Sequence, residues 1–381
     1  MSNNYNLIKK RFQHVVIEGD YYELGQQQGE IMKKTRPEHL EFYKSGNLNL
    51  KDLGFESFED LQHRYEEICP GITDELAGLA DSLGVKPEKL PMYCPPIYES
   101  GNCSQIAVLS SGTDTGDVYV ARNYEYNQEM NDFRLCTARI KGKTKHIGFS
   151  EFLLFRDDGM NDHGFCVTFS GGGTFKTKPT KKGFSFFLIM RALLDNCRSV
   201  DEAINLIEQI PVHGFWNFLL TDRNSNAALV QFFDGDYAIQ RIDPDASEPF
   251  LFSGNHYKIP EMEKYQEFAG DWILVNSKRR CDLIESILRK THPQISKSTL
   301  RDLLSKELYA GLSGHYYSDY FGTLFSMVFD LTNLTVDVCF GSATHNDWKD
   351  PFQFEDSKGV EFYDAIFPDK SITLDKLWTF G

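Results

Sequence analysis

The sequence lacks any apolar run long enough to cross a membrane. No stretch approaches the about 18 consecutive apolar residues typical of a transmembrane helix. The first residues, "MSNNYNLIKKRF", contain no apolar segment of signal-peptide length. We therefore expect a cytoplasmic protein with no membrane partner.

A strongly basic region is also missing. Lys and Arg total 40 against 55 Asp and Glu, which gives a formal net charge of −15. The densest basic stretches, "KGKTK" and "KTKPTKK", are short and typical of hairpins or loops. Because binding to a phosphate backbone requires a basic face, we do not expect a nucleic-acid partner.

The usual motifs of metal and disulfide chemistry are absent as well. Neither C-x-x-C nor H-E-x-x-H occurs, so we expect no metal site and no cofactor. The eight cysteines are scattered along the chain. Without a secretion signal they are expected to be reduced thiols.

What the sequence does contain indicates an α+β fold. Residues 15–92 are predicted to be mostly helical, because apolar positions recur three and four apart. From residue 103 short β-type runs follow, ending with "TLFSMVFDLTN" and "LTVDVCFG". Helices are predicted at 184–197, 199–210, 277–290 and 296–307. Hairpin-like strand blocks between paired helices favour two antiparallel sheets, packed as a sandwich between helix layers.

Cys103, in "ESGNCSQIAV", is the candidate nucleophile, although a buried structural thiol would fit the same pattern. A catalytic cysteine needs a base. A Cys/His hydrolase would use a histidine such as His163, His213 or His256, but none lies in an identifying pattern. A cysteine at a new N-terminus would instead use its own α-amino group, whose pKa of about 7.7–8.0 suits base catalysis near neutrality.

The second solution requires cleavage of the bond between Asn102 and Cys103. The Cys103 thiol would attack the Asn102 carbonyl, and water would hydrolyse the resulting thioester. Residues 1–102 would then be a mostly helical pro-segment. Residues 103–381 would be the catalytic part, integrated with the pro-segment into one globular unit.

Four further stretches carry candidate site residues. In "ARNYEYN", Arg122 would lie beside the thiol and Glu125 near the new amino group, although a surface ion pair has the same spacing. In "FSGGG", backbone N–H groups around Gly171 would donate to an oxyanion, although a hairpin also explains the glycines. Asn255 would be a second donor or a turn cap. "NSKRRC" is predicted to open a helix with two arginines, which the helix dipole disfavours.

Taken together, these residues resemble the acyl-CoA:6-aminopenicillanic-acid (isopenicillin N) acyltransferase family of Cys-type N-terminal-nucleophile (Ntn) hydrolases. Its wider relatives are bile salt hydrolase, penicillin V acylase and the acid-ceramidase-like amidases. "GDYYELGQQQGE" and "CPGITDELAGLADSLGV" resemble the family's pro-segment, and "GNCSQIAV" its processing site. The resemblance continues in family order through "ARNYEYN", "GMNDHGF", "FLLTDRNSNAALVQF", "SGNH" and "TLFSMVFDLTNLTVDVCFG".

The resemblance implies an αββα sandwich, autocatalytic cleavage before Cys103 and acyl transfer from an amide or a thioester. By matching position, Cys103 would be the nucleophile and, through its amine, the base. Arg122 and Glu125 would match the family's arginine and acidic residue. Asn255 would match its oxyanion side chain, and Gly171 its backbone donor. Arg280 or Arg279 would match its supporting arginine.

Two departures from the family pattern bear on processing. Glu125 replaces the usual Asp and adds one methylene where placement should be tight. Asn102 replaces the common Gly before the scissile bond. We expect an enzyme that acts on a linear non-peptide amide, or on an acyl thioester such as acyl-CoA, through a thioester on Cys103. A homo-oligomer is left open, as are two alternatives: an unprocessed ligand-binding relative and an unrelated Cys/His hydrolase.

Overall fold

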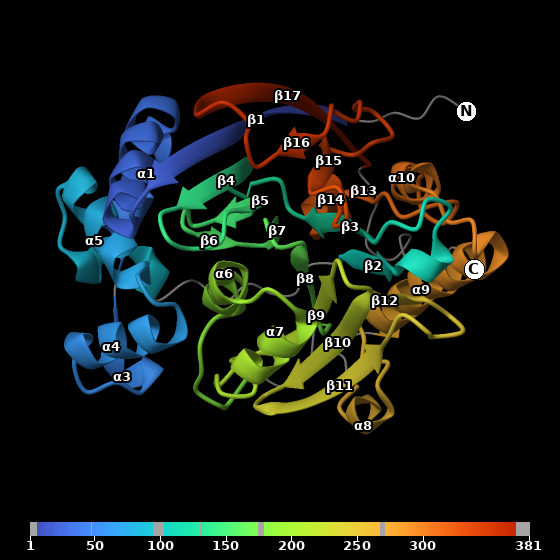
Figure 1. Ribbon diagram of the computed structural model, residues 1–381. Coiled ribbons are helices and arrows are strands. Elements are labelled where there is room, and N and C mark those ends of the chain that lie inside the picture. Colours follow the sequence, from blue (N-terminus) through green and yellow to red (C-terminus); the bar gives the residue numbers. More distant parts are fainter. Residues whose placement is uncertain are drawn as a thin grey trace.

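Two β-sheets form the centre of the molecule (Figure 1). The computed structural model describes residues 6–46, 48–93, 103–129, 131–173, 179–266 and 271–370. The two sheets contain ten and seven strands. They pack against each other through aromatic side chains: the rings of Phe149 and Phe325 are stacked at 3.5 Å, and those of Tyr124 and Phe169 lie edge to face at 6.2 Å.

The larger sheet is antiparallel except for one parallel pair, β1 with β4. Its strand order is β11 (Asp236–Ile242), β10 (Asn226–Phe233), β9 (Phe215–Asp222), β8 (Phe165–Gly171), β7 (Asp158–Asn161), β5 (His146–Glu151), β4 (Arg134–Ile140), β1 (Asn6–Gly19) and β17 (Gly359–Asp369), with β6 (Phe155–Arg156) beside β5.

The smaller sheet is antiparallel throughout. Its strand order is β12 (Phe250–Ser253), β2 (Ser104–Val108), β3 (Tyr119–Tyr126), β14 (Phe321–Asp330), β15 (Thr335–Phe340) and β16 (Phe352–Gln353), with β13 (His315–Tyr316) beside β14. Successive strand residues point to opposite faces. Ile106 and Ala121 therefore leave the inter-sheet core and pack in a second apolar cluster with Ile284 and Leu300.

Helices cover the outer face of each sheet. On the smaller sheet these are α9 (Asp271–Thr291) and α10 (Lys297–Ser305). On the larger sheet, α1 (Tyr21–Thr35) covers β1 and β4, while α6 (Phe186–Asn196) and α7 (Val200–Ile207) cover β7 to β10. The resulting order of helix, sheet, sheet and helix confirms the predicted αββα sandwich.

The remaining helices belong mainly to the N-terminal segment, at the left of Figure 1. They are α2 (Leu40–Lys44), α3 (Leu50–Leu53), α4 (Phe58–Ile68) and α5 (Ile72–Leu83), and α8 (Pro260–Glu263) lies beside β11. Helix α5 packs tightly on α1, because a Cβ added at Gly25 would lie 1.9 Å from the Glu75 carbonyl oxygen. Glycine is therefore required for this approach of the two backbones.

The first and last strands depart from the sequence-based expectation. The predicted mostly helical segment begins with a 14-residue strand, β1, whose Phe12 faces the inter-sheet core while Val15 and Ile17 face α1. Strand β17 pairs with β1 from Asn6–Asp369 to Val16–Gly359, so the predicted final strands at 323–341 are not the last. Both strands are stabilised by pairing between the two ends of the chain, which no local pattern reveals.

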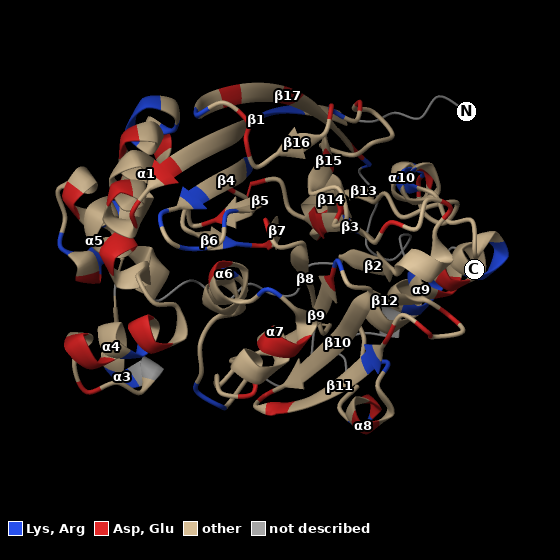
Figure 2. Ribbon diagram, viewed as in Figure 1, with Lys and Arg blue, Asp and Glu red and all other residues tan. Residues whose placement is uncertain are grey.

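Acidic side chains outnumber basic ones on α4 and α5, as Figure 2 shows. A surface of this sign would repel a phosphate backbone. Within the described ranges, no helix has both the length and the apolar content that spanning a membrane requires.

Candidate active site

Cys103 lies directly before β2, between the two sheets, and only 1% of it is exposed. In the ladder of β2 with β3, Gln105 is opposite Arg122, and residues directly opposite each other share a face. Alternate residues of a strand also share a face. Cys103 and Arg122 therefore point to the same, inner side, where Arg122 Nη2 donates a hydrogen bond to Cys103 Sγ at 3.6 Å.

Arg122 is held in place on several sides. Its Nη1 donates to the Asp157 carbonyl oxygen at 3.0 Å and lies 3.2 Å from Asp158 Oδ2. The guanidinium lies over the rings of Tyr124 and Phe169, 5.0 and 4.8 Å from their centroids. These contacts fix the guanidinium of Arg122 beside the Cys103 thiol.

The thiol is nevertheless neutral near pH 7 in the intact chain. Burial raises the pKa of Cys103 to about 11, against the lowering effect of Arg122, and the Glu125 carboxyl raises it further. A nucleophile in this state is latent, because the thiolate is the reactive form.

Glu125 lies on the opposite face of β3, and its side chain is fully buried. Its Oε1 accepts a hydrogen bond from Thr323 Oγ1 at 3.0 Å, while Oε2 has no hydrogen-bond partner among the described residues. Burial raises the pKa of Glu125 to about 8, although Arg280 and Arg122 lower it. The carboxyl is therefore mostly protonated at neutral pH.

Arg280 joins the backbone of Cys103 to Asn255. Its Nη1 donates to the Cys103 carbonyl oxygen at 2.7 Å and to Ser104 Oγ at 2.8 Å, and its Nη2 donates to Asn255 Oδ1 at 2.6 Å. Its Nε donates to Asn276 Oδ1 at 2.9 Å. One buried guanidinium thus fixes the start of β2 relative to the residue that follows β12.

This contact also sets the orientation of the Asn255 amide. Because Oδ1 accepts from Arg280, Nδ2 points away from Arg280 and donates to the Gly171 carbonyl oxygen at 3.1 Å. Gly171 is the last residue of β8, and the N–H of Gly172 donates to the Phe215 carbonyl oxygen at 2.8 Å. The structure therefore brings Asn255 and Gly171 together through the carbonyl of Gly171. The role of Gly171 as a backbone donor to an oxyanion stays a prediction.

The predicted position of Arg280 at the start of a helix is wrong. Helix α9 begins at Asp271, and Arg280 lies in its interior. The buried residues Ile273, Ser277 and Ile284 already continue the helical spacing on both sides of Arg280. The proposed mismatch with the helix dipole therefore disappears.

Two other candidates, Arg279 and His256, lie outside this cluster. Arg279 stacks over the ring of Tyr309 at 4.4 Å, so Arg280 is the arginine that contacts Cys103. Asn102 lies outside the described residues. No hydrogen bond joins Cys103 to His256, whose Nδ1 lies 2.7 Å from Ser277 Oγ and whose pKa is lowered to about 3 by burial.

The other two histidines are also engaged elsewhere. His213 Nδ1 lies 2.8 Å from the Lys181 carbonyl oxygen, and His163 lies beside Asp162. Among the described residues, neither is hydrogen-bonded to Cys103. This geometry does not favour the Cys/His alternative.

Sequence reasoning missed the residues that support the site. Asp158 pairs with Arg122, Thr323 with Glu125, and Asn276 with Arg280. Asp158 directly precedes the stretch "GMNDHGF", but acidic residues beside turns are too common to identify a partner of Arg122. Thr323 and Asn276 lie inside an ordinary strand and helix, where the sequence carries no signal.

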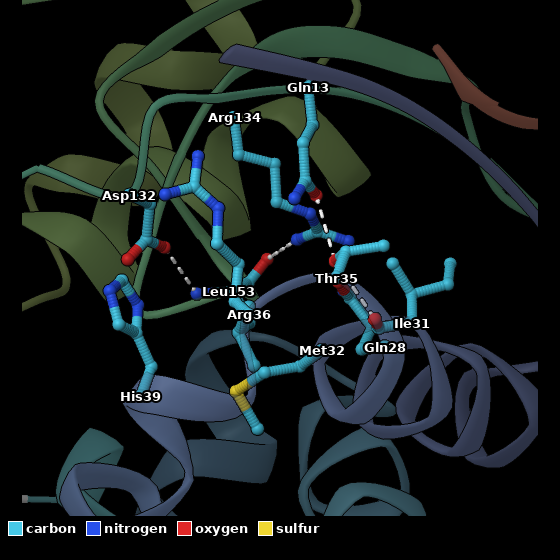
Figure 3. A pocket seen from close by; sticks show the side chains of 10 residues that line it. All are labelled: Gln13, Gln28, Ile31, Met32, Thr35, Arg36, His39, Asp132, Arg134 and Leu153. Carbon is cyan, nitrogen blue, oxygen red and sulfur yellow. Dashed lines mark hydrogen bonds between the residues drawn. The ribbon is translucent and has the colours of Figure 1, made fainter. Parts of the chain in front are cut away.

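A small polar cavity, shown in Figure 3, lies between the end of α1 and the larger sheet. Its volume is about 10 Å³, and its lining includes Gln13, Gln28, Asp132 and Arg134. Gln13 Nε2, Gln28 Oε1 and Arg134 Nε have no hydrogen-bond partner among the described residues. A space of this size and polarity suits one buried water and excludes an acyl substrate.

The order of helix, sheet, sheet and helix is the one that the resemblance to the Ntn hydrolases implies. The chain belongs to the acyl-coenzyme A:6-aminopenicillanic acid acyl-transferase family, which matches residues 112–345. The family is named for acyl transfer, so the chain is an enzyme of the acyltransferase class. The matched region contains Arg122, Glu125, Asn255 and Arg280 and begins after Cys103.

Several solved structures are similar to this chain at low sequence identity. Penicillin V acylase from Agrobacterium tumefaciens is 13% identical, with 68% of this chain and 90% of that chain covered and a TM-score of 0.44. The Caenorhabditis elegans ortholog of N-acylethanolamine-hydrolyzing acid amidase is 13% identical (60% and 93%; 0.40). A conjugated bile acid hydrolase mutant from Clostridium perfringens is 9% identical (71% and 99%; 0.43). No curated protein matches the chain.

Proposed function

We propose that the protein is a self-processing cysteine amidohydrolase or acyltransferase with Cys103 as its nucleophile. The observation that carries the proposal is that two buried arginines donate hydrogen bonds to Cys103. Arg122 donates to its thiol, and Arg280 donates to its carbonyl and to Asn255. A structural thiol in the core needs neither cation, and burying two arginines at one cysteine is costly unless they serve a purpose.

Processing begins with attack of the Cys103 thiol on the Asn102 carbonyl. A C–S bond forms, the C–N bond between the two residues breaks, and the freed nitrogen gains protons to become an amine. Water then hydrolyses the thioester, which releases a free thiol and a free α-amino group on the same residue. Residues 1–102 are the pro-segment of this scheme. They remain attached because β1 lies between β4 and β17 in the larger sheet.

The processed enzyme repeats the same chemistry on its substrate. The α-amine takes the thiol proton while sulfur attacks the acyl carbonyl, and Asn255 Nδ2 together with a backbone N–H near Gly171 stabilises the oxyanion. The leaving amine or thiol takes the proton from the α-ammonium, and an acyl-Cys103 thioester remains. Water or an acceptor amine, deprotonated by the same α-amine, then releases the acyl group.

We propose a linear non-peptide amide as the substrate, with an acyl thioester such as acyl-CoA as the alternative donor. The family name includes an acyl-CoA donor, and the similar solved structures have names that include penicillin V, N-acylethanolamine and conjugated bile acid. Water is always available as an acceptor, which favours hydrolysis over transfer to an amine.

Intact-mass analysis of the purified protein tests the processing step. We expect two fragments, residues 1–102 and 103–381, that migrate together until denatured. The Cys103→Ala variant should remain a single chain. Cys166→Ala is the matched control, because Cys166 is equally buried in β8 and has no hydrogen bond to Arg122 or Arg280, and this variant should cleave normally.

The same samples separate the alternatives. A wild-type chain that stays whole and transfers no acyl group from a panel of acyl amides and acyl-CoA donors would support the ligand-binding alternative. A whole chain whose Cys103 reacts with a thiol probe and hydrolyses these donors would support a cysteine hydrolase that uses another base. Either result would overturn the α-amine mechanism.

A further inference from the structure

Thr323 is the partner of Glu125, and a β-bulge places it there. Gly322 and Thr323 of β14 lie opposite Tyr126 and Glu125, but the register shifts by one residue before Phe325, which lies opposite Tyr124. Without the extra residue, the side chain opposite Glu125 would be that of Leu324. Bulges next to active sites often re-aim one side chain in this way.

The Thr323 hydroxyl takes part in two hydrogen bonds, one as acceptor and one as donor. Gly314 N–H donates to Thr323 Oγ1 at 2.9 Å, and Oγ1 lies 3.0 Å from Glu125 Oε1. A hydroxyl has one proton to donate. Gly314 N–H occupies one of the two acceptor sites of Oγ1, and the hydroxyl donates its proton to Oε1, which is the unprotonated oxygen in this arrangement. When the Glu125 carboxyl is neutral, its proton consequently resides on Oε2.

Oε2 has no close hydrogen-bond partner among the described residues, and the Asn123 side chain, on the same face of β3, also lowers the pKa of Glu125 through a hydrogen-bond interaction. Three observations place Glu125 next to Cys103. The Glu125 backbone N–H interacts with the Cys103 sulfur, the Glu125 charge acts on the thiol, and Arg280, which holds the Cys103 carbonyl, also acts on Glu125. Strand β3 extends past the end of β2, so Glu125 lies on the side of Cys103 from which the chain enters.

We propose that Thr323 is a positioning residue for self-cleavage, which holds Glu125 so that Oε2 delivers its proton to the Cys103 nitrogen. The inference rests on the proposed function and adds the proton donor for its first step. As the C–N bond breaks, Oε2–H protonates the leaving nitrogen and Glu125 becomes a carboxylate. The thiol proton, released as the C–S bond forms, completes the ammonium, so charge and atoms balance in an ammonium–carboxylate pair.

The surroundings of Glu125 support a proton donor before cleavage and a carboxylate after it. The charged and titratable groups that act on it are Arg280 from α9, Arg122 from its own strand, Cys103 before β2 and Tyr317 beside β13. Burial outweighs the two arginines in the intact chain. The new ammonium adds a third positive charge and favours ionisation. The additional methylene of Glu125, relative to aspartate, gives the carboxyl the reach to contact Thr323 and the nitrogen together.

The pH profile of self-cleavage tests the role of Thr323. We expect Thr323→Val to slow cleavage by about 10²-fold, the usual contribution of a positioned acid. We also expect it to move the alkaline limb of the profile to higher pH, because losing this hydrogen bond raises the pKa of Glu125. Thr323→Ser keeps the hydroxyl and should restore the parent profile. Ser326→Ala is the matched control.

Ser326 suits this purpose because it is a buried hydroxyl on the same strand, opposite Asn123, with no hydrogen-bond partner among the described residues. Its variant should leave the rate and the alkaline limb unchanged. A purely structural role for Thr323 would slow Thr323→Val without moving the limb, or would not be rescued by serine, and either result would overturn the proposal.

Infrared spectroscopy tests the same point without any cleavage. In the uncleaved Cys103→Ala protein, the C=O stretch of a protonated carboxyl, assigned by its loss in Glu125→Gln, reports the ionisation of Glu125 with pH. Adding Thr323→Val should raise the midpoint of this titration, and adding Thr323→Ser should not. An unchanged midpoint would overturn the inference, whereas a wild-type chain that never cleaves would overturn the proposed function instead.

Discussion

Two buried arginine clusters in this molecule use the same residue types in opposite ways. In the Arg191 cluster, Arg191 contacts Glu75 at 2.6 Å and Asp195 at 2.9 Å, and Tyr21 donates to Asp195 at 3.0 Å. In the Cys103 site, Arg122 and Arg280 surround a neutral thiol, and Oε2 of Glu125 lacks a hydrogen-bond partner among the described residues.

One buried carboxyl group from each cluster, Asp195 and Glu125, shows the difference most clearly. Burial alone would raise the pKa of Asp195, but Arg191, His146 and Tyr21 hold it well below its usual range. Burial raises the pKa of Glu125 to about 8 because its neighbouring cations do not compensate fully. A saturated cluster stabilises the fold, whereas an unsaturated one holds a group ready to exchange a proton.

The largest expected effect is a loss of stability when Arg191 is replaced, because the Arg191 cluster stabilises the fold. Arg191→Met leaves two carboxylates buried without their cation and should lower the free energy of unfolding by about 3–5 kcal/mol, measured by urea denaturation. Arg241→Met is the control, because the Arg241 side chain is 48% exposed in its pair with Asp201. A loss in Arg191→Met no larger than in this control would break the comparison.

The next effect concerns pH and Glu125. Its folded pKa of about 8 lies above the unfolded value of about 4.3, so between these values the folded chain keeps a proton that the unfolded chain releases. Stability from this group is therefore complete below pH 4 and declines by a few kcal/mol as pH rises toward 9. In the uncleaved Cys103→Ala background, Glu125→Gln should flatten that decline in urea midpoints measured across the range. A parallel decline in both proteins would show that Glu125 is not its source.

The smallest expected effect is the contribution of a single hydrogen bond in the Arg191 cluster to the free energy of unfolding. Tyr21→Phe removes one hydrogen bond to the charged Asp195 and should cost about 1.5 kcal/mol in the free energy of unfolding. Tyr22→Phe is the matched control, because Tyr22 donates to Asp81 at the surface and should be neutral. Equal losses in the two variants would show that burial of the Asp195 bond contributes nothing.

Local patterns predicted much of the fold correctly. The helices at 184–197 and 199–210 appear as α6 and α7, and Ser199 Oγ accepts a hydrogen bond from Glu202 N–H at 3.2 Å. Strands β2, β3 and β14 likewise follow from short β-type runs. These elements are encoded by periodicity and capping residues within about ten positions, so a single sequence suffices to find them.

The missed features all depend on distant parts of the chain. Strand β1 is stabilised by β4 and β17, the interior position of Arg280 by the full length of α9, and the contact of Thr323 with Glu125 by a bulge. The Arg191 cluster also collects Tyr21 and Glu75 from the N-terminal segment. None of these partners lies within reach of a local motif.

The sequence by itself determined the residue types of the candidate site, their order along the chain and most of the local elements, because these depend on neighbouring residues. Only the tertiary structure decided that Arg122 meets the thiol from the inner face of β3 while Glu125 and Arg280 approach from the other. It also decided which buried carboxyl is ionised and which keeps its proton. Pairing register, burial and the count of nearby charges set these properties, and all three arise only when remote segments pack together.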